Sequence, residues 1–280
     1  LVEQRRWISK QDYLDGLAEL HRLGFRYGMV SNGTRLDQSA AARLVAAGID
    51  AISLSMDAPP PLNDELRGKG ATAKVEEAIV HLKDAGFKGK LEIISTLTRP
   101  AIAHLEPMRR YLSQLRVGLW RVAPVMPIGR AAHRPELIPT DADVSALLEF
   151  VVKARADQLL PSPEFCEEGY LGARYEGAVR PYLSQCRAGI TTGGISATGG
   201  IGACPELGPA YLQGDIRTER FRDVWETRYQ NLRDRSWTRR GACADCGAYD
   251  RCRGGSLHLY DKPQAEFLRC LFKMVEPTPP

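Results

Sequence analysis

The first part of this 280-residue chain is predicted to be an α/β domain with parallel strands. One observation is that a helical stretch, a glycine and a strand follow one another repeatedly through the first 155 residues. The other is that each predicted strand ends in polar or glycine residues, as at the ligand-binding edge of parallel sheets. Alternating helices and strands indicate crossover connections. An open doubly wound sheet and a barrel both agree with this pattern.

The elements follow from local signals. Ser9 can cap the first helix, Leu14, Leu17 and Leu20 form its apolar stripe, and Gly24 ends it. Thr140, with Asp143 three residues on, opens the last helix of this part. The elements predicted between them are a buried strand at 25–30, a helix at 36–47, a strand at 51–57, a helix at 72–85, a strand at 91–98, a helix at 102–115 and a strand at 119–126.

Polar residues at the strand ends are the candidate binding groups. Asn32 follows the first strand, Ser55 and Asp57 end the second, and Thr98 ends the third. A hydroxyl or carboxylate at this edge can hold ribose hydroxyls or an amino group. The same residue types also cap helices and form turns, so both roles stay open. Neither a G-x-G-x-x-G motif nor a P-loop follows any strand, so nucleotide binding by those routes has no support.

Composition excludes several classes of protein. The net charge is +4, from 38 basic and 34 acidic residues spread along the chain, which does not favour nucleic acid as a partner. No apolar run approaches the length that spans a membrane. Free thiols without an export signal favour the cytoplasm.

Seven cysteines lie in the second half of the chain, and six of them follow a metal-binding order. Two flank a glycine-rich stretch, three form a C-x₂-C-x₅-C run, and one follows later. Thiolates cluster in this way when they hold a soft metal. The six are Cys186, Cys204, Cys243, Cys246, Cys252 and Cys270.

Cysteines also form disulfide frameworks and zinc sites, and both roles fit this chain less well. A disulfide framework would leave one of seven thiols unpaired, and a chain of this length with 44% hydrophobic residues can build a core without staples. A zinc ribbon usually pairs two C-x₂-C knuckles, and this chain has one. The x₅ gap and the distant Cys270 fit iron–sulfur ligation better.

The composition of the sequence changes after residue 160. Prolines and glycines in 161–172 indicate a linker, which gives predicted domains at 1–160 and 161–280. The stretch between Cys186 and Cys204 predicts a short β-hairpin that brings the two thiols together. Aromatic and apolar residues at helical spacing in 219–235 predict a packed helix.

The second domain resembles the SPASM domain of radical S-adenosylmethionine (SAM) enzymes. Its pattern is C-x₉₋₁₅-G-x₄-C, then C-x₂-C-x₅-C-x₃-C, then a last cysteine; here Cys186, Gly199 and Cys204 match the first part. The first domain resembles the later part of a radical-SAM barrel, through SNGT, ISLSMD, Arg67-Gly68 and PIGRA. The implied fold is a partial (β/α)₆ barrel, incomplete at its N-terminus, followed by a small irregular α+β iron–sulfur domain.

The chain departs from the family pattern in two places. The C-x₃-C-x₂-C loop that holds the catalytic [4Fe–4S] cluster is absent, since the first cysteine is Cys166. The resemblance places that loop before residue 1, so we expect an N-terminal truncation and no radical formation by these 280 residues alone. The second departure is Ser256, which stands where the fourth cysteine of the C-x₂-C-x₅-C-x₃-C run is expected.

The resemblance also implies ligand sets for the auxiliary clusters. One [4Fe–4S] cluster would use a complete set: Cys243, Cys246, Cys252 and Cys270. The other would use Cys186, Cys204 and the position of Ser256. Cys166 or His258 can supply a further ligand, or serve as a buried thiol and an ordinary histidine. An open-coordination cluster, a smaller one or none fits this incomplete set.

The resemblance implies chemistry on S-adenosyl-L-methionine, which is cleaved to a 5′-deoxyadenosyl radical that abstracts hydrogen from a substrate. Ser55 and Asp57, and secondarily Asn32 and Thr98, would contact its ribose or methionine, and Gly129 of PIGRA would lie near its adenine. The expected partners are a peptide or protein substrate and a reductant such as flavodoxin or ferredoxin. The alternatives are a radical SAM enzyme of cofactor or small-molecule biosynthesis, a non-catalytic iron–sulfur module and a zinc-binding module.

Overall fold

The computed structural model describes residues 10–157, 159–182, 185–261 and 263–276. The chain divides into two compact units. The first comprises Leu1–Val125 and Arg134–Cys166, and the second comprises Met126–His133 and Glu167–Pro280. Ser9, the predicted cap of the first helix, lies outside the described residues. Within the described ranges, no helix combines the length and the apolarity needed to cross a membrane.

The first unit is built on one sheet of five parallel strands. Its strands follow one another in chain order across the sheet, whereas a doubly wound sheet reverses its order near the middle. Sequential order with helical crossovers is the arrangement of a barrel, here open and partial. The strands are β1 (Gly28–Ser31), β2 (Ala51–Ser55), β3 (Lys90–Leu97), β4 (Leu119–Pro124) and β5 (Ser162–Phe165).

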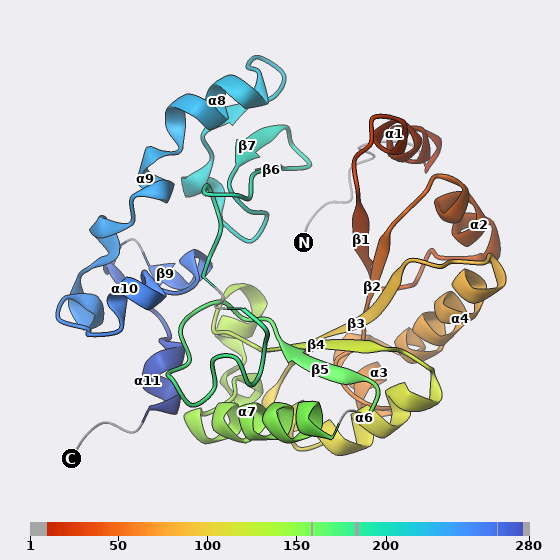
Figure 1. The fold of residues 1–280 in the computed structure, drawn as a ribbon, viewed down its shortest axis with the longest axis horizontal. Helices are drawn as coiled ribbons and strands as arrows, with labels where there is room; N and C mark the ends of the chain where they lie inside the picture. Colours follow the sequence, from red (N-terminus) through yellow and green to blue (C-terminus); the bar gives the residue numbers. More distant parts are fainter. Residues whose placement is uncertain (1–9, 158, 183–184, 262, 277–280) are drawn as a thin grey trace. The chain divides into compact units, whose positions relative to one another are not determined.

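The crossover helices lie along one face of this sheet (Figure 1). Where one helix was predicted at 102–115, the structure has two, separated at Ala103–His104, and the first of them begins earlier, at Arg99. The short helix Leu62–Arg67 was not predicted, and the other helices agree with the prediction to within a few residues at each end. The helices are α1 (Lys10–Arg22), α2 (Gln38–Ala46), α3 (Leu62–Arg67), α4 (Ala71–Asp84), α5 (Arg99–Ile102), α6 (Leu105–Gln114) and α7 (Asp141–Ala156).

Alternation along the strands separates the two faces of the sheet. Ile52 and Leu54 of β2 and Trp120 of β4 are fully buried. Ser53, between Ile52 and Leu54 in β2, points to the opposite face of the sheet. Glu92 of β3 lies beside it there and accepts a hydrogen bond from its hydroxyl. Because successive side chains of a strand alternate, the helix-covered face is apolar while the other face carries polar groups.

The helix predicted to open at Thr140 begins with a capping box, as expected. The Thr140 hydroxyl accepts a hydrogen bond from the Asp143 backbone N–H at 3.2 Å, and the Asp143 carboxylate accepts one from the Thr140 N–H at 2.7 Å. Each contact satisfies an N–H group that has no partner within the helix. The cap fixes where α7 begins, and α7 packs against β5.

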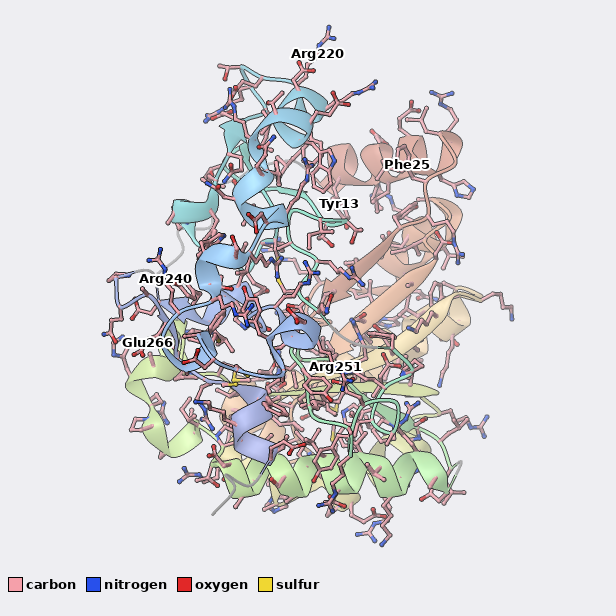
Figure 2. The ribbon with its side chains drawn as sticks, turned by 60° about the vertical axis from the view of Figure 1, so that its left-hand side comes forward. Tyr13, Phe25, Arg220, Arg240, Arg251 and Glu266 are labelled. Carbon is pink, nitrogen blue, oxygen red and sulfur yellow. The ribbon has the colours of Figure 1, made fainter. Side chains whose placement is uncertain are left out.

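The two edge strands differ from the prediction. The strand at 25–30 was expected to be buried, but Val30 is 62% and Phe25 59% exposed (Phe25 is labelled in Figure 2). β1 is the first strand in the order and pairs only with β2 among the described strands. β5 lies in the stretch that the sequence indicated as a linker, beyond the predicted boundary at 160. Pro163 argues against a strand in the sequence, because proline has no N–H to donate to a neighbouring strand. An edge strand nevertheless tolerates proline.

The second unit is a small domain of short elements, as predicted. The glycine-rich stretch forms the predicted hairpin of β6 and β7, and β8 extends it. The helix predicted at 219–235 is divided at Tyr229, which is fully buried. The principal elements are β6 (Gly194–Ile195), β7 (Gly200–Gly202), β8 (Gly214–Asp215), α8 (Phe221–Arg228), α9 (Gln230–Arg233), α10 (Tyr249–Cys252), β9 (Tyr260–Asp261), β10 (Glu266–Phe267) and α11 (Leu271–Val275).

The capping box of α7 gives a test of this description. We expect Thr140→Ala to lower the free energy of unfolding by about 1 kcal/mol, because it leaves the Asp143 N–H without its hydroxyl partner. Thr140→Ser keeps that hydroxyl and is the control. Urea titration followed by circular dichroism measures both variants; equal loss in the two would contradict the role of the cap.

Candidate metal centre

Four cysteines of the second unit gather around one pocket. Cys243, Cys252 and Cys270 line it, together with mostly apolar neighbours. Cys246 is close enough to add to the electrostatic field at Cys243. These thiols come from separate elements, because Cys252 ends α10 while Cys270 follows the β9–β10 hairpin and caps α11. Figure 2 labels Arg251 of α10 and Glu266 of β10 in this region.

Burial and repulsion from neighbouring cysteines make Cys243 and Cys252 poor anions on their own. Burial, followed by the nearby Cys270, Cys252 and Cys246, raises the pKa of Cys243 to about 11. Burial likewise raises the pKa of Cys252. Several thiolates in one poorly hydrated pocket need cationic compensation, which iron or another soft metal supplies.

The backbone around Cys252 is shaped to hydrogen-bond its sulfur. The N–H groups of Tyr170, Gly254 and Gly255 oppose the rise in the pKa of this thiol. Arg253, Gly254 and Gly255 all have left-handed conformations, with φ of 50°, 85° and 71°. Successive N–H groups in such a turn form an anion-binding concavity. Hydrogen bonds of this kind set the potential of iron–sulfur clusters.

The donor chemistry of this pocket fits an iron–sulfur cluster. Its four candidate ligands are all cysteines, and a [4Fe–4S] cluster takes four thiolates, one on each iron. The residues of this pocket therefore fit a [4Fe–4S] group, with four thiols as its donors.

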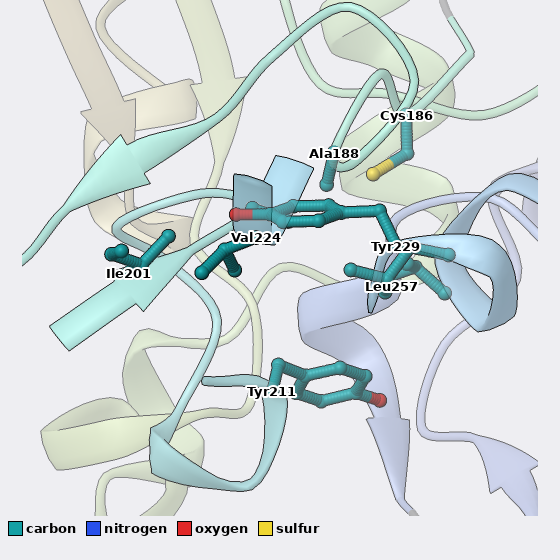
Figure 3. Close-up of a cluster of buried hydrophobic side chains, with 9 residues drawn as sticks. Cys186, Ala188, Ile201, Tyr211, Val224, Tyr229 and Leu257 are labelled. Atoms are coloured by element: carbon teal, nitrogen blue, oxygen red, sulfur yellow. The ribbon is translucent and has the colours of Figure 1, made fainter. Parts of the chain in front are cut away.

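The two hairpin thiols have different surroundings. Cys186 is 5% exposed within an apolar cluster that includes Ala188, Tyr229 and Leu257, and Cys204 packs against that cluster (Figure 3). Burial raises the pKa of Cys204, and the proximity of Cys186 adds to the rise. The hairpin thus brings the two thiols close together, as predicted, with Cys186 in the apolar cluster and Cys204 at its edge, near the carboxylates of Glu168 and Glu206.

The other proposed ligands are engaged elsewhere. The Ser256 hydroxyl donates to Glu167 Oε1 at 2.5 Å, and His258 Nε2 lies 3.7 Å from the same oxygen. Cys166 directly follows β5, and its backbone N–H donates to the carbonyl of Val122. Cys166 therefore belongs to the sheet of the first unit.

At the carboxyl edge of the sheet, Asn32 and Thr98 have local structural partners. The Asn32 side chain accepts a hydrogen bond from the Thr34 N–H at 3.1 Å, which forms a turn. The Thr98 hydroxyl accepts one from the Ala101 N–H at 3.3 Å and caps α5. Gly129 begins a 3₁₀-helix, Gly129–His133, with φ of 55°, which few residues other than glycine adopt.

Asp57 is held in place by a cation and a backbone donor. The Arg67 guanidinium binds both carboxylate oxygens, at 2.6 and 2.9 Å, and the Thr96 N–H donates to one of them at 2.8 Å. This clamp ties the end of β2 to β3 and to α3. Ser55 is half-buried and shares the polar face of β2 with Ser53, so it points toward the side of the sheet that helices do not cover.

An ionic cluster on this polar face was not predicted from the sequence. Glu92 is 3% exposed and contacts Ser53 Oγ at 2.6 Å, Arg121 Nε at 2.9 Å and Lys90 Nζ at 2.9 Å. Burial alone raises the pKa of Glu92, but these partners outweigh it and leave the pKa below its ordinary value. The position of Glu92 within an otherwise apolar strand could have indicated this cluster, because a buried glutamate requires charged or hydrogen-bonding partners.

The turn at Cys252 leads to a test. A Cβ on Gly254 would lie 2.7 Å from Phe267 and 2.8 Å from the Thr238 hydroxyl, at a left-handed φ. We expect Gly254→Ala to cost at least about 1–2 kcal/mol of stability and to lower the iron content. Gly247→Ala, just before α10 and with nothing within 4 Å of the added methyl, is the control. Iron assay and denaturation measure both; normal iron and stability in the Gly254 variant would refute this account of the turn.

Comparison with known proteins agrees with the two units. Residues 7–100 match the Radical SAM superfamily, and residues 186–247 match the SPASM iron–sulfur cluster-binding domain. The chain is 32% identical over 247 residues to the mycofactocin maturase MftC of Mycobacterium ulcerans, covering 86% of this chain and 64% of that protein. It therefore spans just under two thirds of the length of that relative.

Two further proteins are similar. An AdoMet-dependent heme synthase of Oleidesulfovibrio alaskensis is 27% identical, covering 83% of this chain and 63% of that protein. The solved structure of anSMEcpe with bound AdoMet has a TM-score of 0.70 at 18% identity, covering 94% of this chain and 76% of the other. The same protein with AdoMet and the Cp18Cys peptide has a TM-score of 0.68. Two parts of the chain thus match two family models, the Radical SAM superfamily over residues 7–100 and the SPASM iron–sulfur cluster-binding domain over residues 186–247.

Proposed function

We propose that this chain acts as a radical SAM enzyme that modifies a peptide or protein. The observation that carries the proposal is the four-thiol pocket of Cys243, Cys246, Cys252 and Cys270 in a chain that also has a radical SAM domain. When bound and reduced, a catalytic iron–sulfur cluster supplies the electron that cleaves S-adenosylmethionine to the hydrogen-abstracting 5′-deoxyadenosyl radical. The four thiols would hold an auxiliary [4Fe–4S] cluster.

The residues of the first unit would bind and orient S-adenosylmethionine. Ser55 offers a hydroxyl on the polar face of the sheet. Asp57, fixed by Arg67, orients the end of β2 and can accept one further hydrogen bond. Asn32 and Thr98 would act through their turns, which place backbone groups at the strand ends. The helix-covered face is apolar, so the cofactor has its polar partners on the opposite face.

A peptide substrate is supported by two similarities. The first is the identity to a maturase, and the second is the fold shared with anSMEcpe, whose structure holds a peptide. A cross-link, a thioether or an epimerised centre are the reaction types we consider. A cofactor precursor is the alternative substrate, favoured by the identity to an AdoMet-dependent heme synthase. A short precursor-peptide gene beside this one would favour the peptide.

The proposed enzyme needs an electron donor and a reducing compartment. A flavodoxin or ferredoxin is the expected reductant, because cluster reduction takes one electron at low potential. The cytoplasm is the expected compartment, since thiols that ligate iron persist where thiols are kept reduced.

The S-adenosylmethionine site leads to a binding prediction. We expect Ser55→Ala to weaken binding about fivefold, the effect of losing one hydrogen bond worth about 1 kcal/mol. Ser113→Ala, at an exposed position of α6, is the control and should bind normally. Equilibrium binding by calorimetry on the reconstituted protein measures both. Normal affinity in the Ser55 variant would remove this residue from the site.

The activity is tested on the product of the complete open reading frame, reconstituted without oxygen. We expect dithionite and S-adenosylmethionine to yield 5′-deoxyadenosine, measured by chromatography. Cys243→Ala should lose about four irons and four sulfides. If the reading frame supplies no C-x₃-C-x₂-C loop and no 5′-deoxyadenosine forms, the catalytic proposal is wrong. Zinc without sulfide would instead support a structural metal module.

A further inference from the structure

The residues at the first auxiliary position do not fit a second four-iron cluster. Where the family pattern expects a cysteine, the Ser256 hydroxyl is buried, at 1% exposure for the residue. It lies 2.5 Å from Glu167 Oε1, 3.1 Å from the Glu168 carbonyl oxygen and 3.4 Å from Glu168 Oε2. The Ser256 hydroxyl, which stands where the family pattern has a thiolate, therefore has carboxylate and carbonyl oxygens as its hydrogen-bond acceptors.

A buried arginine continues this network. Arg180 is fully buried and donates to the carbonyl oxygens of Glu167 at 2.6 Å and Gly169 at 2.5 Å. It also pairs with Glu176 at 2.6 Å. Glu167 thus accepts two hydrogen bonds, one at its carboxylate from the Ser256 hydroxyl and one at its main-chain carbonyl from Arg180. The network holds the segment 167–180 against the loop that carries Ser256.

The thiols available at this position are too few. Apart from the four around the pocket, residues 167–280 contain only Cys186 and Cys204. Cys186 lies in the apolar cluster of Figure 3. Four-iron clusters take four thiolates, whereas carboxylate and hydroxyl oxygens suit harder metals. Two thiols beside two glutamates and a serine are therefore a poor donor set for such a cluster.

We propose that Cys186 and Cys204 hold no [4Fe–4S] cluster, and that the network of Ser256, Glu167 and Arg180 joins the surrounding segments in place of one. The chain then carries a single auxiliary cluster. This inference rests on the proposed function, because it takes Cys243, Cys246, Cys252 and Cys270 as the ligands of that cluster.

The first test counts iron and sulfide in the 280-residue chain after anaerobic reconstitution. We expect about four of each. Cys186→Ala with Cys204→Ala should leave the count unchanged, while the matched pair Cys243→Ala with Cys270→Ala should lose it. About eight irons in the parent chain would overturn this inference alone. A chain that takes up neither iron nor sulfide would instead contradict the proposed function.

The second test separates a structural serine from a metal ligand. We expect Ser256→Ala to keep its iron and to lower the thermal midpoint by about 2 to 4 °C, because Glu167 loses a buried hydrogen-bond donor. Because Ser256 also lines the pocket of Cys243, Cys252 and Cys270, iron loss in a variant whose circular dichroism matches that of the parent would show that Ser256 contributes to metal binding. That result would overturn the purely structural role proposed for it. Iron assay and thermal melts on the same preparation decide between these results.

Discussion

The burial of four thiols in one pocket is the constraint that shapes the second unit. Burial and repulsion from neighbouring cysteines raise the pKa of Cys243, so the thiolate set needs cations to exist there. The surrounding backbone accommodates this set through three left-handed residues after Cys252 and a hairpin that returns Cys270 to the same pocket. Because such a site has no counterpart in an unfolded chain, metal binding and folding of this unit are coupled.

The structure of the first unit follows from a different constraint. A parallel sheet has to bury one face under its crossover helices. Sequential strand order places those helices on one side, which leaves the other side to polar groups. Glu92 and Arg121 neutralise one another there, and the clamp of Asp57 by Arg67 fixes the end of β2. Polar side chains therefore gather on the uncovered face and at the carboxyl edge of the strands, where parallel α/β domains bind their ligands.

The two groups of thiols have the cysteine spacing of one family but different surroundings. Both match the spacing of one family, yet Cys243 lies among other thiols while Cys186 lies among Ala188, Tyr229 and Leu257. A single replacement, serine at position 256, accompanies a network of carboxylates and a buried arginine. Ligand chemistry thus depends on what surrounds each sulfur as much as on the cysteine itself.

The sequence alone determined the features that depend on near neighbours in the chain: helices ended by glycine, the box of Thr140 and Asp143, and the hairpin between Cys186 and Cys204. Only the tertiary structure decided that β1 is exposed, that β5 joins the sheet despite Pro163, and that Glu92 pairs with Arg121. The physical reason is that capping and turn formation involve residues a few positions apart. Edge position and ion pairing depend on which strands become neighbours, and that is set by packing across the whole sheet.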